Sequence, residues 1–257
     1  MGEVALEVAL RKRLDDRRKV FVPYVTGGLA GVDAELLHEI EACGADALEI
    51  GVPFSDPIMD GGVIQEASRR ALENGFHVRD VFGLVAEAKL GIPVLLMTYL
   101  NPIVAMSLEE FVRAAEVAGA AGFIVPDLPV DEGGDWTALC AESGLASVYL
   151  AAPGTSEERL AQVVDSSTGF VYCVSTYGVT GQRVSLADSS RQLVEALRLL
   201  TARPLLVGVG ISTAEQAAEA ATFADGVIVG SALVAPLLEG DRRGALAAAR
   251  SFRAALT

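Results

Sequence analysis

The sequence is poor in the residues that build metal centres and disulfide frameworks. Its 257 residues include three cysteines, Cys43, Cys140 and Cys173, and two histidines, His38 and His77. The cysteines are an odd number at wide spacing, and two of them lie in apolar stretches, so buried free thiols are expected rather than a disulfide set. A zinc site is not expected with two histidines. No metal is therefore assigned to this chain.

The sequence also lacks an excess of positive charge and a long apolar run. Twenty Lys and Arg against 34 Asp and Glu give a formal net charge of -14. This argues against nucleic acid or an anionic membrane as a partner, because both require a cationic face. No apolar run approaches the roughly 20 residues that cross a bilayer, and residues 1–20 show no signal-peptide pattern. We therefore expect a cytoplasmic protein.

Apolar residues are plentiful, at 51% of the chain. Eight short apolar runs rich in β-branched residues alternate with amphipathic segments. Such runs are typical of strands that are buried on both faces of a parallel sheet. They cover residues 20–25, 45–52, 93–98, 122–125, 147–151, 169–174, 204–209 and 225–229. Helix-capping residues precede several of the amphipathic segments: Asp33, Ser107, Ser156 and the pair Ser212-Thr213.

The alternation predicts an α/β fold, a single (βα)8 TIM barrel that forms one domain over residues 1–257. No break in composition and no long polar linker divides the chain. A doubly wound open sheet is the rival fold, but Thr26-Gly27-Gly28-Leu29 after the first run does not match its glycine-rich fingerprint. Extra helices are expected at the N-terminus, over residues 6–17, and at residues 65–74.

Glycine-bearing loops follow the last three predicted strands, at residues 178–181, 208–212 and 230–232. In barrels of this kind the active site lies at the C-terminal ends of the strands. Glycine lets the backbone approach an anion closely, and N–H groups at a helix start supply partial positive charge. Each loop alone could be a tight turn. Three at adjacent strand ends, with the Ser212 and Ser231 hydroxyls nearby, predict a phosphate site.

Two carboxylates lie near the end of the second predicted strand. Glu49 is flanked by apolar residues, where a glutamate is costly unless it is paired or functional. Burial near the barrel mouth raises a carboxyl pKa toward neutrality, which suits a general acid or base; a glutamate satisfied by structural hydrogen bonds is the alternative. Asp60 follows one loop later on the same rim, and it could equally be a helix cap.

Apolar and aromatic side chains are expected to line the barrel mouth above the phosphate site if they point inward, although they could also belong to the ordinary core. They are Phe21, Met97, Ile124, Leu150 and Tyr172. Tyr99 and Asp127 follow the third and fourth predicted strands on the same rim. Asp127, in Pro126-Asp127-Leu128-Pro129, is more typical of a carboxylate that braces a loop.

At these residues the sequence resembles the alpha subunit of tryptophan synthase. The strongest match is the run over residues 48–57, completed by Asp60-Gly61 and Ile64-Gln65. Supporting matches follow in order along essentially the whole chain. They are residues 21–24, 97–103 and 126–129 and the three glycine-bearing loops.

The resemblance implies a lyase of tryptophan biosynthesis. The family cleaves indole-3-glycerol phosphate to indole and glyceraldehyde 3-phosphate in a retro-aldol reaction. By resemblance, Glu49 protonates the indole C3 and takes a proton from the glycerol hydroxyl, and Asp60 accepts the indole N–H and stabilises the cationic indolenine. The partner is then a tryptophan synthase beta subunit in an alpha2beta2 heterotetramer. The resemblance implies no organic cofactor for this chain, because the pyridoxal phosphate of the family belongs to that beta subunit.

The resemblance also assigns the remaining site residues. Thr180 matches a threonine in a loop that closes over substrate, and Tyr172 matches a pocket tyrosine. The expected substrate-binding set is Phe21, Met97, Tyr99, Ile124, Leu150, Tyr172 and Thr180. The expected phosphate-binding set is Gly181, Gly210, Gly230 and Ser231.

The loop that carries Asp60 departs from the common family pattern at Met59, Gly62 and Val63. Two consecutive glycines are expected to loosen this loop. The departures leave an alternative open, a stand-alone indole-3-glycerol phosphate lyase of a specialised pathway that works without a beta subunit. A catalytically dead barrel that only binds a beta subunit would not retain Glu49 and Asp60. Another phosphate-binding barrel enzyme would not explain residues 48–57.

Overall fold

The computed structural model describes residues 4–175 and 186–256. Its parallel strands form one sheet in the order β5-β4-β3-β2-β1-β9-β8-β7-β6. The strands are β1 (Val20–Thr26), β2 (Leu48–Gly51), β3 (Val94–Met97), β4 (Gly122–Ile124), β5 (Ala146–Val148), β6 (Leu150–Ala151), β7 (Val171–Val174), β8 (Leu205–Gly208) and β9 (Gly226–Val229).

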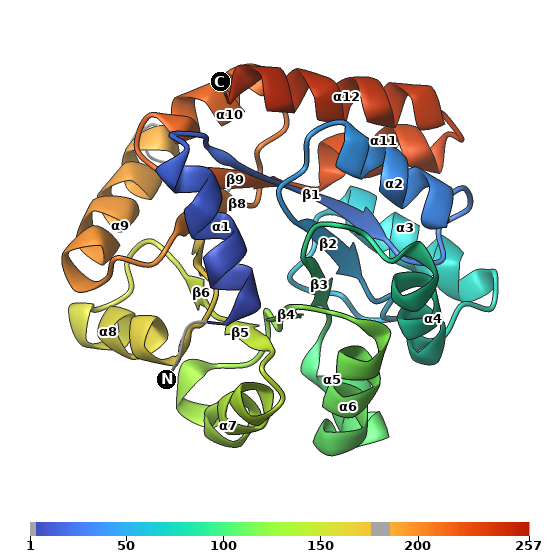
Figure 1. Ribbon diagram of the computed structural model, residues 1–257, viewed down its shortest axis with the longest axis horizontal. Helices are drawn as coiled ribbons and strands as arrows, with labels where there is room; N and C mark the ends of the chain where they lie inside the picture. The colour runs from blue at the N-terminus through green and yellow to red at the C-terminus, as the bar shows by residue number, and fades with distance from the viewer. Residues whose placement is uncertain (1–3, 176–185, 257) are drawn as a thin grey trace.

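Helices surround the strands on the outside (Figure 1). They are α1 (Ala5–Asp15), α2 (Ala34–Ala42), α3 (Gly62–Glu73), α4 (Val78–Ala88), α5 (Leu100–Met106), α6 (Leu108–Ala118), the short 3-10 helix η1 (Val130–Glu132), α7 (Gly134–Glu142), α8 (Glu157–Ser166), α9 (Leu186–Leu200), α10 (Ala214–Ala221), α11 (Ser231–Leu238) and α12 (Arg242–Ala255). Within the described ranges, none of these helices is long and apolar enough to cross a bilayer.

The predicted TIM barrel is confirmed. Each of the eight predicted strands contains or overlaps an observed one, and β5 and β6 together make the fifth because only Tyr149 separates them. β5 pairs with β4 and β6 pairs with β7, so the ring of strands closes through Tyr149. The extra N-terminal helix is also confirmed as α1.

The expected helix starts are also found. The side chain of Asp33 accepts a hydrogen bond from the Leu36 N–H at 2.8 Å and caps α2. Ser107, Ser156 and Thr213 cap α6, α8 and α10 in the same way. These caps satisfy N–H groups that have no partner inside the helix.

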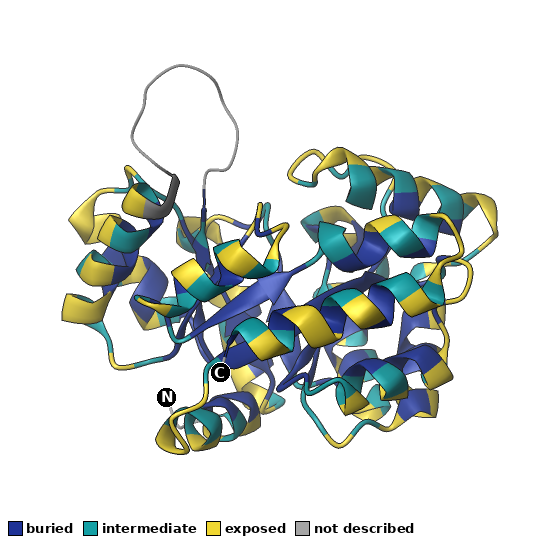
Figure 2. Ribbon diagram, turned by 90° about the horizontal axis from the view of Figure 1, so that it is seen from above, coloured by how far each residue is buried: buried dark blue, intermediate teal, exposed yellow. Residues whose placement is uncertain are grey.

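The buried apolar residues form two clusters, one inside the barrel and one in the layer around it. Inward residues of the strands, such as Val22, Leu95 and Leu206, pack together, and Leu6 and Leu10 of α1 join them. α1 therefore covers the N-terminal end of the barrel, where Figure 1 shows it crossing the ring of strands. The larger cluster fills the space between the strands and the helices. Figure 2 shows the result, with buried strands at the centre and helices exposed on their outer sides.

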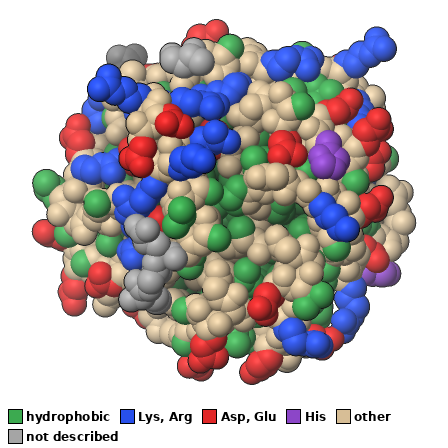
Figure 3. All heavy atoms as spheres, in the orientation of Figure 1, with side chains coloured by type: hydrophobic (Ala, Val, Ile, Leu, Met, Phe, Trp, Pro, Cys, Tyr) green, Lys and Arg blue, Asp and Glu red, His purple; other side chains and the backbone are tan. Residues whose placement is uncertain are grey.

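A buried carboxylate ties the chain together at the N-terminal end. The side chain of Asp46 is 1% exposed, and it accepts hydrogen bonds from the Phe21 N–H at 3.0 Å and from Arg253 at 2.8 Å. Arg13 lies 3.1 Å and Arg18 lies 3.8 Å from its second oxygen. Figure 3, a view onto this end, shows Lys and Arg side chains gathered at its upper left. Asp46 thus links α1, β1 and α12.

Replacing Asp46 by Ala is expected to lower the free energy of unfolding by about 3 kcal/mol, because the partly buried Arg253 loses its carboxylate partner. The Arg18→Ala variant is the matched control. Its side chain is 46% exposed, so its loss is expected to cost less than about 1 kcal/mol. Urea unfolding of both variants measures the difference, and equal losses would show that Asp46 does not organise this cluster.

Candidate active site

A cavity of about 310 Å³ opens at the C-terminal ends of the strands. This is the end of the barrel opposite to α1, where TIM-barrel enzymes place their active sites. Nine of the residues predicted for the site lie on its wall. They are Glu49, Asp60, Met97, Ile124, Leu150, Tyr172, Gly210, Gly230 and Ser231.

Glu49 points from β2 into this cavity and is 3% exposed. Its Oε2 atom has no hydrogen-bond partner within the described part of the chain. Burial, and then the charge of Asp60, raise the pKa of Glu49 from its ordinary value near 4.5 to about 8. The carboxyl group is therefore protonated at neutral pH. It can donate that proton to a group inside the cavity.

Asp60 lies on the loop between β2 and α3. Burial raises the pKa of Asp60 to about 6, although a hydrogen bond from Tyr99 lowers it. Asp60 therefore remains an anion at neutral pH, beside a protonated Glu49. The alternative that Asp60 caps a helix is wrong, because Gly61 is the N-cap of α3 and no side chain caps that helix.

Tyr99 lies behind Asp60 and does not line the cavity. Its hydroxyl accepts a hydrogen bond from the Met59 N–H at 3.0 Å and bonds to the Asp60 carboxylate. Its ring stacks on Phe54 with the ring centroids 5.1 Å apart. Tyr99, which we expected among the substrate-binding residues, therefore holds the loop that carries Asp60.

Phe21 is the one predicted lining residue that points the other way. Side chains alternate along a strand, so Val20, Val22 and Tyr24 of β1 face inward and Phe21 faces the helices. Phe21 is fully buried there and stacks on Phe252, with the ring centroids 6.4 Å apart. The expectation that Phe21 lines the mouth is wrong.

Tyr24 takes the place that we assigned to Phe21. It lines the cavity, and its pairing between β1 and β2 sets it directly beside Glu49. Its hydroxyl lies over Gly51, where a Cβ atom would collide with the phenolic oxygen. Only glycine at position 51 leaves room for this ring. Counting two residues at a time from Val20 would have found Tyr24 from the sequence.

Despite its departures from the family pattern, the loop that carries Asp60 is held by hydrogen bonds at Met59 and at Asp60. The side-chain amide of Gln65 donates to the Asp60 carbonyl oxygen at 2.9 Å. Met59 lines the cavity. Gly62 is the first residue of α3, and Val63 packs against the core.

Another part of the cavity wall is made of glycine-rich backbone. Gly210 comes from the loop after β8, and Gly230 and Ser231 form the start of α11. A helix N-terminus directs N–H groups and partial positive charge into such a space. Ser212 also lies on this wall, but its hydroxyl bonds to Gln216 at 3.0 Å. Thr180 and Gly181 lie outside the described residues.

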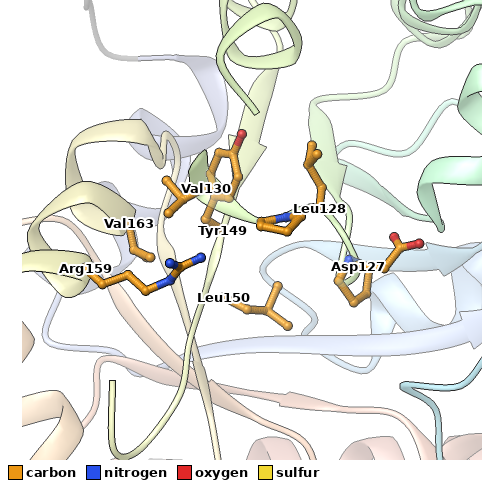
Figure 4. Close-up of a pocket in the computed structure, with 9 residues that line it drawn as sticks. Asp127, Leu128, Val130, Tyr149, Leu150, Arg159 and Val163 are labelled. Atoms are coloured by element: carbon orange, nitrogen blue, oxygen red, sulfur yellow. The ribbon is translucent and has the colours of Figure 1, made fainter. Parts of the chain in front are cut away.

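A second, smaller cavity of about 280 Å³ adjoins the first and shares Pro126 and Leu150 with it. In Figure 4, Asp127 and Arg159 lie on opposite sides of it. Asp127 accepts a hydrogen bond from the Leu100 N–H at 2.9 Å. Asp127 therefore braces the start of α5 against the loop after β4, as its sequence context indicates.

The described residues contain no group of three or more His, Cys, Asp and Glu side chains arranged to hold a metal ion. The three cysteines are free thiols. Cys140 and Cys173 are buried, and Cys43 is partly exposed. The reactive groups of the main cavity are therefore its carboxyl groups, tyrosines and backbone N–H groups.

The fold and the cavity define the class of protein: a TIM-barrel protein with a pair of carboxyl groups in a cavity at the C-terminal ends of its strands. Residues 10–254 match the family model of the tryptophan synthase alpha chain. The chain belongs to the tryptophan synthase alpha chain family, which confirms the resemblance seen in the sequence.

Individual relatives and solved structures agree. A tryptophan synthase alpha chain from Leifsonia xyli is 44% identical over 246 residues, which is 93% of each chain. One from Gloeobacter violaceus is 46% identical over 91% of this chain and 88% of its own. The structure of Mycobacterium tuberculosis tryptophan synthase matches with a TM-score of 0.90 at 36% identity, covering 99% of both chains. Tryptophan synthase subunit alpha from Legionella pneumophila matches with a TM-score of 0.88 at 35% identity, also over 99% of both chains.

Proposed function

We propose that this chain is a lyase that cleaves indole-3-glycerol phosphate to indole and glyceraldehyde 3-phosphate, as the alpha subunit of a tryptophan synthase in tryptophan biosynthesis. The observation that carries the proposal is the division of charge between the two carboxyl groups. Glu49, with its pKa near 8, is protonated at neutral pH, whereas Asp60, with its pKa near 6, is ionised. Two such groups with separated pKa values serve as an acid and an anionic stabiliser.

The reaction begins with proton transfer from Glu49 to C3 of the indole ring. The ring becomes a cationic indolenine, and the Asp60 carboxylate accepts the indole N–H and stabilises that charge. Glu49, now a carboxylate, takes the proton of the glycerol hydroxyl next to the ring. As the carbonyl of the aldehyde forms, the bond between ring and side chain breaks and its electron pair returns to the ring. Indole and glyceraldehyde 3-phosphate result, and Glu49 is protonated again.

The two ends of the cavity suit the two ends of this substrate. Met97, Ile124 and Leu150 offer an apolar surface to the indole, beside Tyr172. The phosphate is placed against Gly210, Gly230 and Ser231, where backbone N–H groups bind it without a lysine. By family resemblance, Thr180 and Gly181 complete the site.

Exposed apolar side chains near the cavity mouth support a protein partner. Ile58 is 81% exposed and Met59 is 55% exposed on the loop after β2, and Val104 of α5 is 55% exposed. Apolar side chains gathered on one rim are typical of an interaction surface. We assign this rim to a beta subunit in an alpha2beta2 complex. The stand-alone alternative has no support from the relatives described above, which are named as alpha chains.

Indole release from indole-3-glycerol phosphate by the purified chain tests this function. We expect slow turnover alone and an increase of about tenfold or more when a tryptophan synthase beta subunit is added. Absence of indole in both cases would contradict the assigned reaction. Fast turnover that the beta subunit leaves unchanged would contradict the partnership and restore the stand-alone lyase.

A further inference from the structure

Val209 adopts a backbone conformation that β-branched residues avoid. Its φ of 65° is in the left-handed region, and that of Gly210 is 83°. In this region the Cβ atom crowds the backbone, and a branched side chain crowds it most. Val209 lines the cavity on the loop after β8 and is 46% exposed. An exposed valine has no packing of its own to impose this conformation, so neighbouring groups must impose it.

Ser175, immediately after β7, holds the carbonyl side of this loop. Its side chain is fully buried, and its hydroxyl donates to the Gly208 carbonyl oxygen at 3.0 Å and to the Val209 carbonyl oxygen. The Ser175 N–H also donates to the Gly208 oxygen at 3.0 Å. One hydroxyl proton is thus shared between two successive carbonyl groups. Those two carbonyl groups are held on the same side of the turn.

Tyr172 holds the loop from within the cavity. Its hydroxyl is hydrogen-bonded to the backbone of Val209. It also lies against Gly208, where a Cβ atom would collide with the phenolic oxygen. Tyr172 and Ser175 therefore contact the Gly208–Val209 segment together and leave Val209 little freedom to rotate. The next residue along the chain is Gly210, one of the proposed phosphate-binding positions.

We propose that Ser175 is a positioning residue for the phosphate end of the substrate, because its hydroxyl holds Val209 in the left-handed conformation that places Gly210 on the same cavity wall as Ser231. Ser175 is not among the described residues that line the cavity, so its hydroxyl acts through Val209. The inference rests on the proposed phosphate site. Without the hydroxyl, Val209 relaxes to a common backbone conformation and carries Gly210 away.

The test compares Ser175→Ala in two backgrounds. In the wild-type background we expect the Kd for glycerol 3-phosphate and the KM for indole-3-glycerol phosphate to rise about tenfold, which is the effect of one lost hydrogen bond. We expect kcat to change less than about threefold. Glycine adopts the left-handed conformation at no steric cost. In a Val209→Gly background the same substitution is therefore expected to change both constants less than about threefold. Ser175→Thr, which keeps the hydroxyl, is expected to bind like the wild type.

Two results would overturn the inference: unchanged phosphate binding in Ser175→Ala, or an equal loss in both backgrounds. If Ser175→Ala does not fold, Ser175→Cys keeps the volume with a weak donor and takes its place in the comparison. Ser231→Asp separates the inference from the proposed site. Its carboxylate suits the first turn of α11 but repels a phosphate. Full phosphate binding by Ser231→Asp would mean that the phosphate site is misplaced. Loss of phosphate binding in Ser231→Asp, together with normal binding by Ser175→Ala, would refute only the positioning role of Ser175.

Discussion

Replacing Glu49 by Gln is expected to lower the rate of indole release by about 10²–10⁴-fold, the usual contribution of a general acid and base. The amide keeps the shape of the side chain but can neither protonate C3 of the indole nor take the proton of the glycerol hydroxyl. Because Glu49 is not one of the proposed phosphate-binding residues, substrate binding should be retained. Single-turnover kinetics at saturating substrate separate the two effects.

The matched control is Glu87→Gln, a change of the same chemistry on the exposed side of α4. It is expected to leave turnover unchanged. Turnover by Glu49→Gln at the level of this control would remove Glu49 from its assigned role. A loss of binding equal to the loss of rate would make Glu49 a residue that holds substrate rather than one that transfers protons.

The same substitution is expected to change stability in a pH-dependent manner. Glu49 has a folded-state pKa near 8, above its ordinary value near 4.5. The stabilisation that its protonated form supplies is complete below pH 4.5 and is lost as pH rises through 8. The amide in the variant does not titrate, so at pH 9 the Glu49→Gln protein should be more stable than the wild type by roughly 2–4 kcal/mol. Urea unfolding at pH 5 and pH 9 measures this difference, which should nearly vanish at the lower pH.

The second large effect is expected at Asp60. The Asp60→Asn variant should lose about 10²–10³-fold in kcat, because an amide cannot stabilise the positive charge that develops on the indole ring. The charge exists mainly along the reaction path, so KM should change much less. Steady-state kinetics of indole release measure both constants. Wild-type kcat in this variant would leave Asp60 with only its structural contacts to Tyr99 and Gln65.

The barrel could be predicted because its signals are local and repeated. Each apolar run is short, and a capping residue such as Asp33 or Ser107 marks the start of several helices. The first and last residues of the strands could be predicted less well. Residues 45–52 were predicted as one strand, but β2 covers only Leu48–Gly51, because the chain before it turns to place Asp46 among arginines. That turn depends on α1 and α12, which are distant in the sequence.

The candidate site could be predicted from the sequence in part. Glu49 and Asp60 stood out because carboxylates near a buried strand are unusual. The prediction for Phe21 was wrong because side chains alternate between the two faces of a strand, and the motif alone does not show which face Phe21 occupies. Tyr99 was expected at the substrate, but its contact with Met59 and Asp60 is set by the loop's path in space. The conformation of Val209 likewise depends on Ser175 and could not be predicted from its own neighbours in the chain.

The central claim is that the enzyme works with Glu49 protonated and Asp60 ionised, and the pH dependence of kcat/KM for indole release tests it most directly. We expect a bell-shaped profile that rises through about pH 6 and falls through about pH 8, the two apparent pKa values of the interacting pair. The falling limb should vanish in the residual activity of Glu49→Gln. A wild-type profile that stays level from pH 5 to pH 9, or that rises without falling, would contradict this division of charge.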